Sequence, residues 1–210
     1  MKKTIVAAGV FFLSYAAVAQ TGPAELMAGD KYIHYQHSLA QFFSTESPTG
    51  WQHIATLIKR YDKAGGKAKL ADELMNQVYI TAQLSRVFSV KGGLFYTNTG
   101  GFKPSAGIQV FIHKKNWRLL LSPRADIAKK ASYELFTMAE FTPAVAAETK
   151  LYIRLQAMSN AGAQHNRSYQ LLRLGIERKG IQYGAGITTD EYGTNGIVHV
   201  NTGVFIRKLF

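Results

Sequence analysis

The sequence predicts an all-β protein: an antiparallel up-and-down transmembrane β-barrel of about 10–12 strands. Three observations predict this fold class. Apolar and polar residues alternate with period two in many segments, the connections between these segments alternate between short and long, and the chain begins like an exported protein. Sustained alternation is typical of strands, because a 3.6-residue period would distribute the polar residues around a helix.

The composition is that of a folded chain. Of the 210 residues, 47% are hydrophobic and 12% are aromatic, whereas disordered chains have few aromatics and low hydrophobicity. Cysteine is absent, which excludes disulfides, thiolate metal sites and a cysteine nucleophile. The net charge of +12 is compatible with three kinds of partner: nucleic acid, an anionic membrane surface, or solutes in a positively biased lumen.

Residues 1–19 are a predicted secretory signal peptide. Lys2 and Lys3 precede an apolar stretch of about 14 residues, which ends in Ala17-Val18-Ala19, an A-x-A cleavage signature. This stretch is shorter than the roughly 20 residues of a spanning helix, and no later run reaches that length, so a helical membrane protein is excluded. A buried N-terminal helix is the alternative. Residues 20–210 are then a single barrel domain, and export argues against a nucleic-acid partner.

Eleven segments of the mature chain have strand character. Alternation is strict in residues 76–85, 107–113, 117–124, 151–158 and 181–188, and less regular in residues 32–43, 51–61, 90–97, 132–141, 168–178 and 197–210. Single-chain bacterial barrels have an even number of strands. Either residues 21–30 add a twelfth strand, or residues 32–43 lie outside the wall and ten remain. Pro23 and the short length of the first segment argue against twelve.

The connections are sorted by length. Tight turns are expected at residues 86–89, 113–116 and 177–180, and longer polar loops at residues 62–72, 98–105, 125–131, 159–167 and 189–196. Short turns at one end and long loops at the other are typical of outer-membrane barrels, so the predicted location is the cell outer membrane. Aromatic girdles at both interfaces would use residues near strand ends: Trp51, Trp117, Tyr133, Phe141, Tyr169, Tyr183, Tyr192 and Phe210.

The C-terminus resembles the last strand of bacterial outer-membrane β-barrels. The chain ends in Phe210, with Val204 and Ile206 on one face of the final strand, and Lys208 departs from the pattern. The resemblance implies that the barrel-assembly machinery reads these residues and that the protein is a small barrel of the OmpX or small-porin type. The Ala-Gln end of the signal peptide and the segment around Ser159 and Asn160 are similar to small barrels of Bacteroidota.

The faces opposite the apolar ones carry charges of both signs. If lipid surrounds the apolar faces, these charges form a ladder in the lumen, where neighbouring strands pair them. The ladder consists of Arg118, Arg124, Glu134, Glu140, Arg154, Arg173 and Glu177. Glu140 is expected to lie between strands that carry Arg124 and Arg154. The alternative is a set of solvated charges on a soluble barrel.

One catalytic alternative involves Ser159 and His165. The segment Met158-Ser159-Asn160 is similar to the His-x-Ser-Asn motif of lipid A deacylases, but Ala157 occupies the position of the motif's histidine, so the serine lacks a local base. No metal site is predicted, because His34 and His37 are three residues apart and therefore face opposite sides of a strand. No cofactor is predicted either.

The predicted function is that of an integral outer-membrane barrel with a structural or passive small-solute channel role. Its partners would be outer-membrane lipid and lipopolysaccharide, and the latter would contact basic residues in the loops: Lys63, Lys67, Lys69, Lys129, Lys130 and Arg167. Two alternatives remain: an outer-membrane lipid hydrolase that uses Ser159 and His165, and a soluble periplasmic β-barrel that binds an apolar ligand.

Overall fold

The computed structural model describes residues 22–61, 71–129, 131–162, 167–193 and 196–210. These residues form strands joined by turns and loops. The strands are β1 (Pro23–Gly29), β2 (Tyr32–Phe42), β3 (Thr49–Arg60), β4 (Glu73–Gln83), β5 (Phe88–Thr97), β6 (Gly101–Lys114), β7 (Trp117–Asp126), β8 (Ser132–Phe141), β9 (Ala144–Ala146), β10 (Thr149–Gly162), β11 (Arg167–Arg178), β12 (Ile181–Tyr192) and β13 (Ile197–Leu209).

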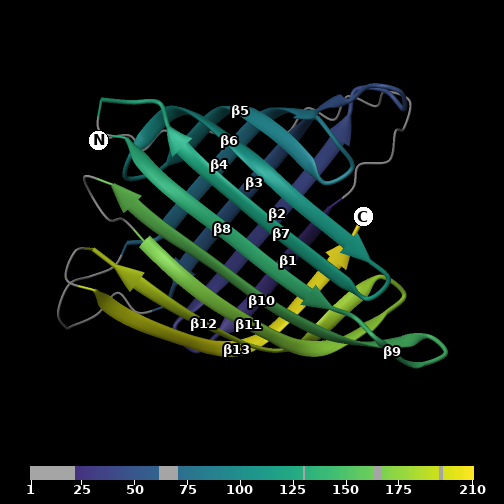
Figure 1. Ribbon diagram of the computed structural model, residues 1–210. Coiled ribbons are helices and arrows are strands. Elements are labelled where there is room, and N and C mark those ends of the chain that lie inside the picture. Colours follow the sequence, from purple (N-terminus) through teal and green to yellow (C-terminus); the bar gives the residue numbers. More distant parts are fainter. Residues whose placement is uncertain (1–21, 62–70, 130, 163–166, 194–195) are drawn as a thin grey trace, which may run out of the picture.

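Within the described residues, twelve strands close into an antiparallel barrel (Figure 1). Each strand pairs with the next along the chain, and β1 pairs with β13 to complete the ring. The short β9 pairs only with β10, in the connection between β8 and β10. The predicted fold class, an antiparallel up-and-down β-barrel, is confirmed.

The twelfth strand is β1, which the sequence argument disfavoured because of Pro23. Pro23 is the first residue of β1 and lies opposite Leu209. At the first position of a strand, the missing N–H of proline removes no necessary ladder bond. The N–H of Phe210 donates to the carbonyl of Gly22 at 3.1 Å, so the pairing extends past the proline on the other strand.

The first and last described strands pair with Pro23 opposite Leu209, so both ends of the described chain lie at one end of the barrel, here called the terminal end. The other end is called the distal end. Since neighbouring strands are antiparallel, the three predicted tight turns lie at the terminal end and the five predicted longer loops at the distal end. Lys179 and Gly180 have φ values of 52° and 74°, as a two-residue type I′ hairpin turn requires. The predicted sorting by length is largely wrong: the terminal connections at residues 43–48 and 142–148 are longer than the distal ones at residues 98–100, 163–166 and 193–196. In addition, β1 and β2 are joined at the distal end by Asp30 and Lys31 alone.

The barrel is apolar outside and polar inside. Exposed apolar side chains cover the outer wall, among them Val78, Ile80, Leu94, Leu119, Leu121, Leu135, Leu155, Leu174, Val204 and Ile206. Among the described residues, one buried apolar cluster is formed, by Met27, Tyr152 and Phe205. Among the described residues, no helix has the length and hydropathy to cross a membrane. An apolar exterior around a polar interior is typical of a barrel embedded in lipid.

Aromatic side chains gather near both rims of the outer wall. The rings of Trp117 and Phe141 stack at 4.3 Å near the terminal end, and those of Tyr96 and Phe102 lie 4.6 Å apart near the distal end. Tyr169 and Tyr192 were expected in these girdles, but they share the inner face with buried Asp190 and Arg167. The girdle prediction is therefore wrong for these two residues.

We expect a charge on the outer wall to disrupt insertion. Leu155 is 57% exposed and lies between Ala139 and Leu172 on neighbouring strands. Leu155→Arg should lower the free energy of unfolding by about 2–4 kcal/mol in urea titrations from liposomes. Ile127→Arg, at an exposed position directly after β7, is the control and should stay within about 0.5 kcal/mol of the parent. Equal effects of the two substitutions would contradict a lipid-facing outer wall.

Candidate functional site: the barrel lumen

All seven residues of the predicted charge ladder lie on the inner face of the barrel. Strand register places Arg118 opposite Glu140, Arg124 opposite Glu134, and Arg154 opposite both Glu140 and Arg173. Glu177 lies opposite Gln182, which is fully buried. The alternation of each strand therefore aims these side chains into the lumen, but their partners are partly different from the neighbours that the sequence suggested.

Arg124 is held by two carboxylates and one ring. Its guanidinium donates to Glu134 at 2.8 Å and to Asp126 at 2.5 Å, and it lies 3.9 Å from the ring centroid of Phe95. Asp126 is also 3.4 Å from the ammonium of Lys103. Among the described contacts, Arg124 therefore pairs with these two acids and not with Glu140.

Glu140 pairs with arginines other than the expected Arg124 and Arg154. Only 1% of Glu140 is exposed, and its carboxylate lies 2.8 Å from Arg207 and 3.5 Å from Arg118. The hydroxyl of Tyr152 also donates to it, at 3.2 Å. Arg207 belongs to β13, which is separated from β8 by three strands of the wall. The ion pair therefore crosses the lumen.

Glu25 is the centre of a second cross-lumen cluster. Arg154 donates to Glu25 at 2.5 Å, Arg173 donates to it at 3.0 Å, and the amide of Gln36 donates at 3.2 Å. All three ionic side chains are at most 3% exposed. Glu25 was not among the predicted ladder residues, because Pro23 and the short length of residues 21–30 argued against a wall strand there.

A smaller cluster lies near the terminal end. Lys150 and Gln182 donate to Glu177 at 2.7 and 2.6 Å, and Arg207 donates to Gln182. These contacts connect the predicted ladder residue Glu177 to the Glu140 cluster through neutral Gln182. Glu177, Glu140 and Arg118 therefore belong to one polar network, whereas Arg124 with Glu134, and Arg154 with Arg173, belong to two other clusters.

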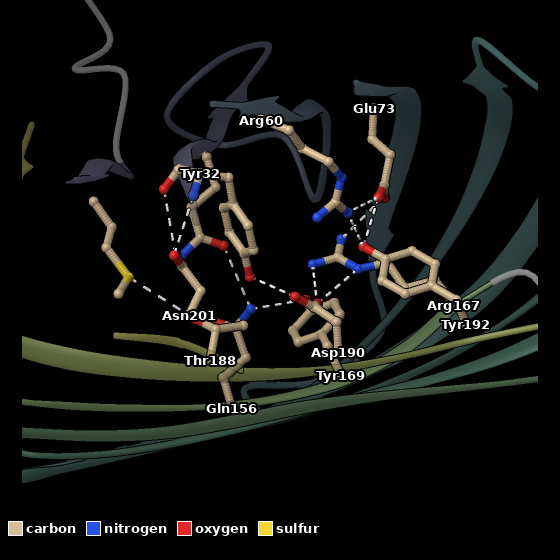
Figure 2. A network of polar contacts seen from close by, with 12 residues as sticks. Tyr32, Arg60, Glu73, Gln156, Arg167, Tyr169, Thr188, Asp190, Tyr192 and Asn201 are labelled. Carbon is tan, nitrogen blue, oxygen red and sulfur yellow. Dashed lines mark hydrogen bonds and ion pairs between the residues drawn. The ribbon is translucent and has the colours of Figure 1, made fainter. Parts of the chain in front are cut away.

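A third network bridges the lumen near the distal end (Figure 2). Arg60 on β3 and Glu73 on β4 reach Arg167 and Tyr192 on β11 and β12, which are on the far side of the ring. Arg60 lies 2.9 Å from Glu73 and donates to the Tyr192 hydroxyl at 2.7 Å; that hydroxyl donates to Glu73 at 2.5 Å. Arg167 lies 3.6 Å from Glu73. We call these four residues the distal bridge.

Asp190 anchors the distal bridge to the wall. Arg167 donates to Asp190 at 2.5 Å, and the hydroxyl of Tyr32 donates to the other carboxylate oxygen (Figure 2). Asn201 accepts from the backbone N–H of Tyr32 at 3.2 Å. Arg167 was expected to face lipopolysaccharide from a loop. It is instead the first residue of β11, with a side chain that is only 11% exposed and paired within the lumen.

A cavity of about 600 Å³ remains inside the barrel. Its lining begins at Pro23 and Leu209 at the terminal end and reaches Arg167 and Tyr169 below the distal bridge. Between these ends it is lined by polar side chains, including Gln52, Gln77, Lys91, Gln109, Arg118, Ser122, Arg124, Glu134 and Gln156, and by apolar ones, including Ile54, Met75, Phe111, Leu120, Phe136, Met138 and Met158. At roughly 30 Å³ per water molecule, it has room for about 20 waters.

The catalytic alternative finds no support in the described residues. Ser159 is exposed and lies opposite Leu135 on the apolar outer face, whereas His165 lies outside the described residues. Neither His34 nor His37 contributes to a cluster of three metal-binding side chains in the described part of the chain. His34 points inward and is buried, and His37 points outward, as their spacing predicted.

Comparison with known proteins supports the fold. No family model matches the sequence. No curated protein matches it significantly. Among solved structures, the chain is similar to LpxR from Salmonella typhimurium, with a TM-score of 0.51 and 6% identity over 90% of this chain and 100% of that one.

Two porin structures are also similar. The KdgM porin in complex with disordered oligogalacturonate has a TM-score of 0.49 and 11% identity, over 90% of this chain and 99% of that one. The NanC porin has a TM-score of 0.48 and 10% identity, over 91% and 99%. At such identities the likeness concerns the fold alone. The chain is a small antiparallel β-barrel with an apolar exterior and a lumen that is partly filled.

Loss of Glu140 should leave buried arginines unpaired. Glu140→Ala is expected to lower the free energy of unfolding by about 3–5 kcal/mol, because Arg207 would stay buried without its carboxylate. Glu148→Ala removes a carboxylate that is 59% exposed and 3.7 Å from Arg178, and it should cost about 0–1 kcal/mol. Urea unfolding in detergent micelles compares the two. A loss below about 1 kcal/mol for Glu140→Ala would mean that water screens this cluster.

Proposed function

We propose that this chain is an outer-membrane channel for small solutes, with a preference for anions. The observation that carries the proposal is the continuous cavity from the terminal end to the distal bridge inside a barrel with an apolar exterior. A lipid-embedded wall and a polar, hydrated lumen are the two physical requirements of a passive barrel channel.

The preference for anions follows from the charges on the inner face. Cations outnumber carboxylates there: the cations are Arg60, Lys91, Lys103, Arg118, Arg124, Lys150, Arg154, Arg167, Arg173 and Arg207, and the carboxylates are Glu25, Glu73, Asp126, Glu134, Glu140, Glu177 and Asp190. A lumen with low-dielectric walls concentrates ions of the opposite sign. Anions should therefore pass more readily than cations of the same size.

The second candidate is a closed structural barrel. It is favoured by the contacts that cross the lumen, namely the distal bridge and the clusters of Glu25 and Glu140. If these contacts are permanent, no continuous water path connects the two ends. A lipid hydrolase and a soluble periplasmic barrel have less support, because Ser159 contacts no described base and the outer wall is apolar.

The outer wall and the chain end indicate the expected partners. Lipid would surround the apolar wall, and lipopolysaccharide would contact the distal loops, where Lys129 is exposed. The other proposed loop lysines, Lys63, Lys67, Lys69 and Lys130, lie outside the described residues, as does the proposed signal peptide 1–19. Val204, Ile206 and Phe210 are exposed on the outside of the last strand, where the barrel-assembly machinery would reach them. Kinship with OmpX or with barrels of Bacteroidota stays a prediction.

Conductance in planar bilayers tests the channel. We expect single-channel steps and a reversal potential that indicates anion preference in a KCl gradient. Arg118 lines the cavity, and one partly screened charge is worth about 0.5 kcal/mol. Arg118→Gln should therefore lower the anion-to-cation permeability ratio about twofold. Arg178→Gln, at an exposed outer position, is the matched control. Absence of any conductance would contradict the proposed channel and favour the closed structural barrel.

The distal bridge should limit the current. Glu73 holds Arg60, Arg167 and Tyr192 together, so Glu73→Gln is expected to loosen the bridge and to raise single-channel conductance. The same variant should show more frequent opening in long recordings. Asp30→Asn, at the same end of the barrel but paired with Lys31 and outside the bridge, should conduct like the parent. Unchanged conductance in Glu73→Gln would mean that the narrowest point lies elsewhere.

A further inference from the structure

Lys91 is the exception among the buried cations of the lumen. It is 8% exposed and lines the cavity, and its ammonium lies 4.9 Å from the ring centroid of Tyr79. Within the described residues, its ammonium forms no hydrogen bond and has no carboxylate within 4 Å, and Glu134, the carboxylate that attracts it from further away, is paired with Arg124. The buried arginines Arg124, Arg154, Arg173 and Arg207 each contact a carboxylate directly.

Such a cation is costly to bury unless something compensates its charge. The ring of Tyr79 offsets part of this cost through a cation–π contact, but it supplies no hydrogen-bond acceptor for the ammonium protons. Buried charges in proteins are usually paired or bound to an ion. An anion in the cavity would supply the missing partner.

The surroundings of Lys91 provide both space and further donors. Register places Gly107 between Lys91 and Arg124 on three adjacent strands. A Cβ at Gly107 would lie 3.3 Å from Cε of Lys91, so the lysine extends over the glycine toward β7. Nε of Arg124 and Oγ of Ser122 are buried there without a partner. Three unpaired polar groups therefore occur on one part of the wall.

The nearby carboxylates do not satisfy Lys91. Glu134 and Asp126 accept hydrogen bonds from the terminal nitrogens of Arg124, at 2.8 and 2.5 Å. Asp126 also pairs with Lys103, so Arg124 and Lys103 match the two carboxylates and Lys91 remains the third cation of the group. Gln109, two residues after Gly107 on the same face, also lines the cavity and adds a neutral amide. This combination of donors suits a small oxyanion better than a halide, because an oxyanion accepts several hydrogen bonds at once.

We propose that Lys91, Ser122 and the Nε edge of Arg124 form an anion-binding subsite in the lumen, which takes a carboxylate or an inorganic oxyanion. The subsite deepens the proposed channel function and rests on it for access, since solutes must enter the cavity to reach Lys91. It would hold an anionic group transiently during passage.

Binding is tested on the folded barrel in detergent micelles, independently of conductance. The midpoint of thermal unfolding is measured with increasing sodium acetate or sodium sulfate, with sodium chloride keeping the ionic strength constant. A ligand that binds only the folded state raises the midpoint in a saturable way. The parent protein should show this rise. Lys91→Met should weaken the apparent affinity about tenfold, the effect of one lost charge-assisted hydrogen bond.

Two further variants keep the test decisive. Lys103→Met removes the same charge from the same face, but Lys103 is paired with Asp126, so the parent's response should be retained. Lys91→Arg keeps the charge and should retain binding even if Lys91→Met does not fold. A response to acetate alone would identify a carboxylate site, and a response to sulfate alone an inorganic-oxyanion site.

The proposal is overturned if the parent shows no saturable response, or if Lys91→Met and Lys103→Met lose it equally. Different results would disprove the proposed channel and the proposed subsite. Binding in micelles without conductance in bilayers would remove the channel and keep the subsite, whereas conductance without Lys91-dependent binding would do the reverse.

Discussion

Pairing between the first and last strands is the constraint on which the rest of the structure depends. In lipid no water satisfies a backbone N–H or C=O, so an open sheet edge is excluded and the sheet must close. Seven residues of β1 achieve this against β13, from Pro23 opposite Leu209 to Gly29 opposite Gly203. Closure makes the number of wall strands even, places both ends of the described chain at one rim, and fixes for every strand which residues point inward.

Once the inner face is fixed, its charges determine how the lumen is filled. A buried arginine needs a carboxylate, and Glu25 and Glu140 reach arginines several strands away. The wall of β11–β13 is consequently packed, with Arg173, Gln182 and Asn201 fully buried. The remaining cavity is lined by residues of β3–β8, such as Ser122, and also by residues of β1, β2, β10, β11 and β13.

The sequence was sufficient to predict the faces but not the partners. Period-two alternation placed all seven ladder residues on the inner face, because inside and outside differ by one residue along a strand. It paired Glu140 with Arg124 and Arg154, since only neighbouring strands can be compared in a sequence. The contact with Arg207 depends on the cross-section of the closed barrel, which no local pattern encodes. Glu25 was missed for a different reason: the strand that carries it begins with proline.

Polar groups away from water must be hydrogen-bonded on the outer wall as well as in the lumen. Tyr35, His37, His53 and Asn76 point outward from three adjacent strands, and each is bonded to the next: 2.9 Å from the Tyr35 hydroxyl to Nδ1 of His37, 2.9 Å between the two imidazoles, and 3.1 Å to the amide of Asn76. Because the chain of contacts is complete, these side chains need no external partner, and they do not argue for a docking surface. Lys91, by contrast, is buried although its ammonium has no hydrogen-bond partner among the described residues. That contrast is the reason to assign a ligand to the lumen and none to the outer wall.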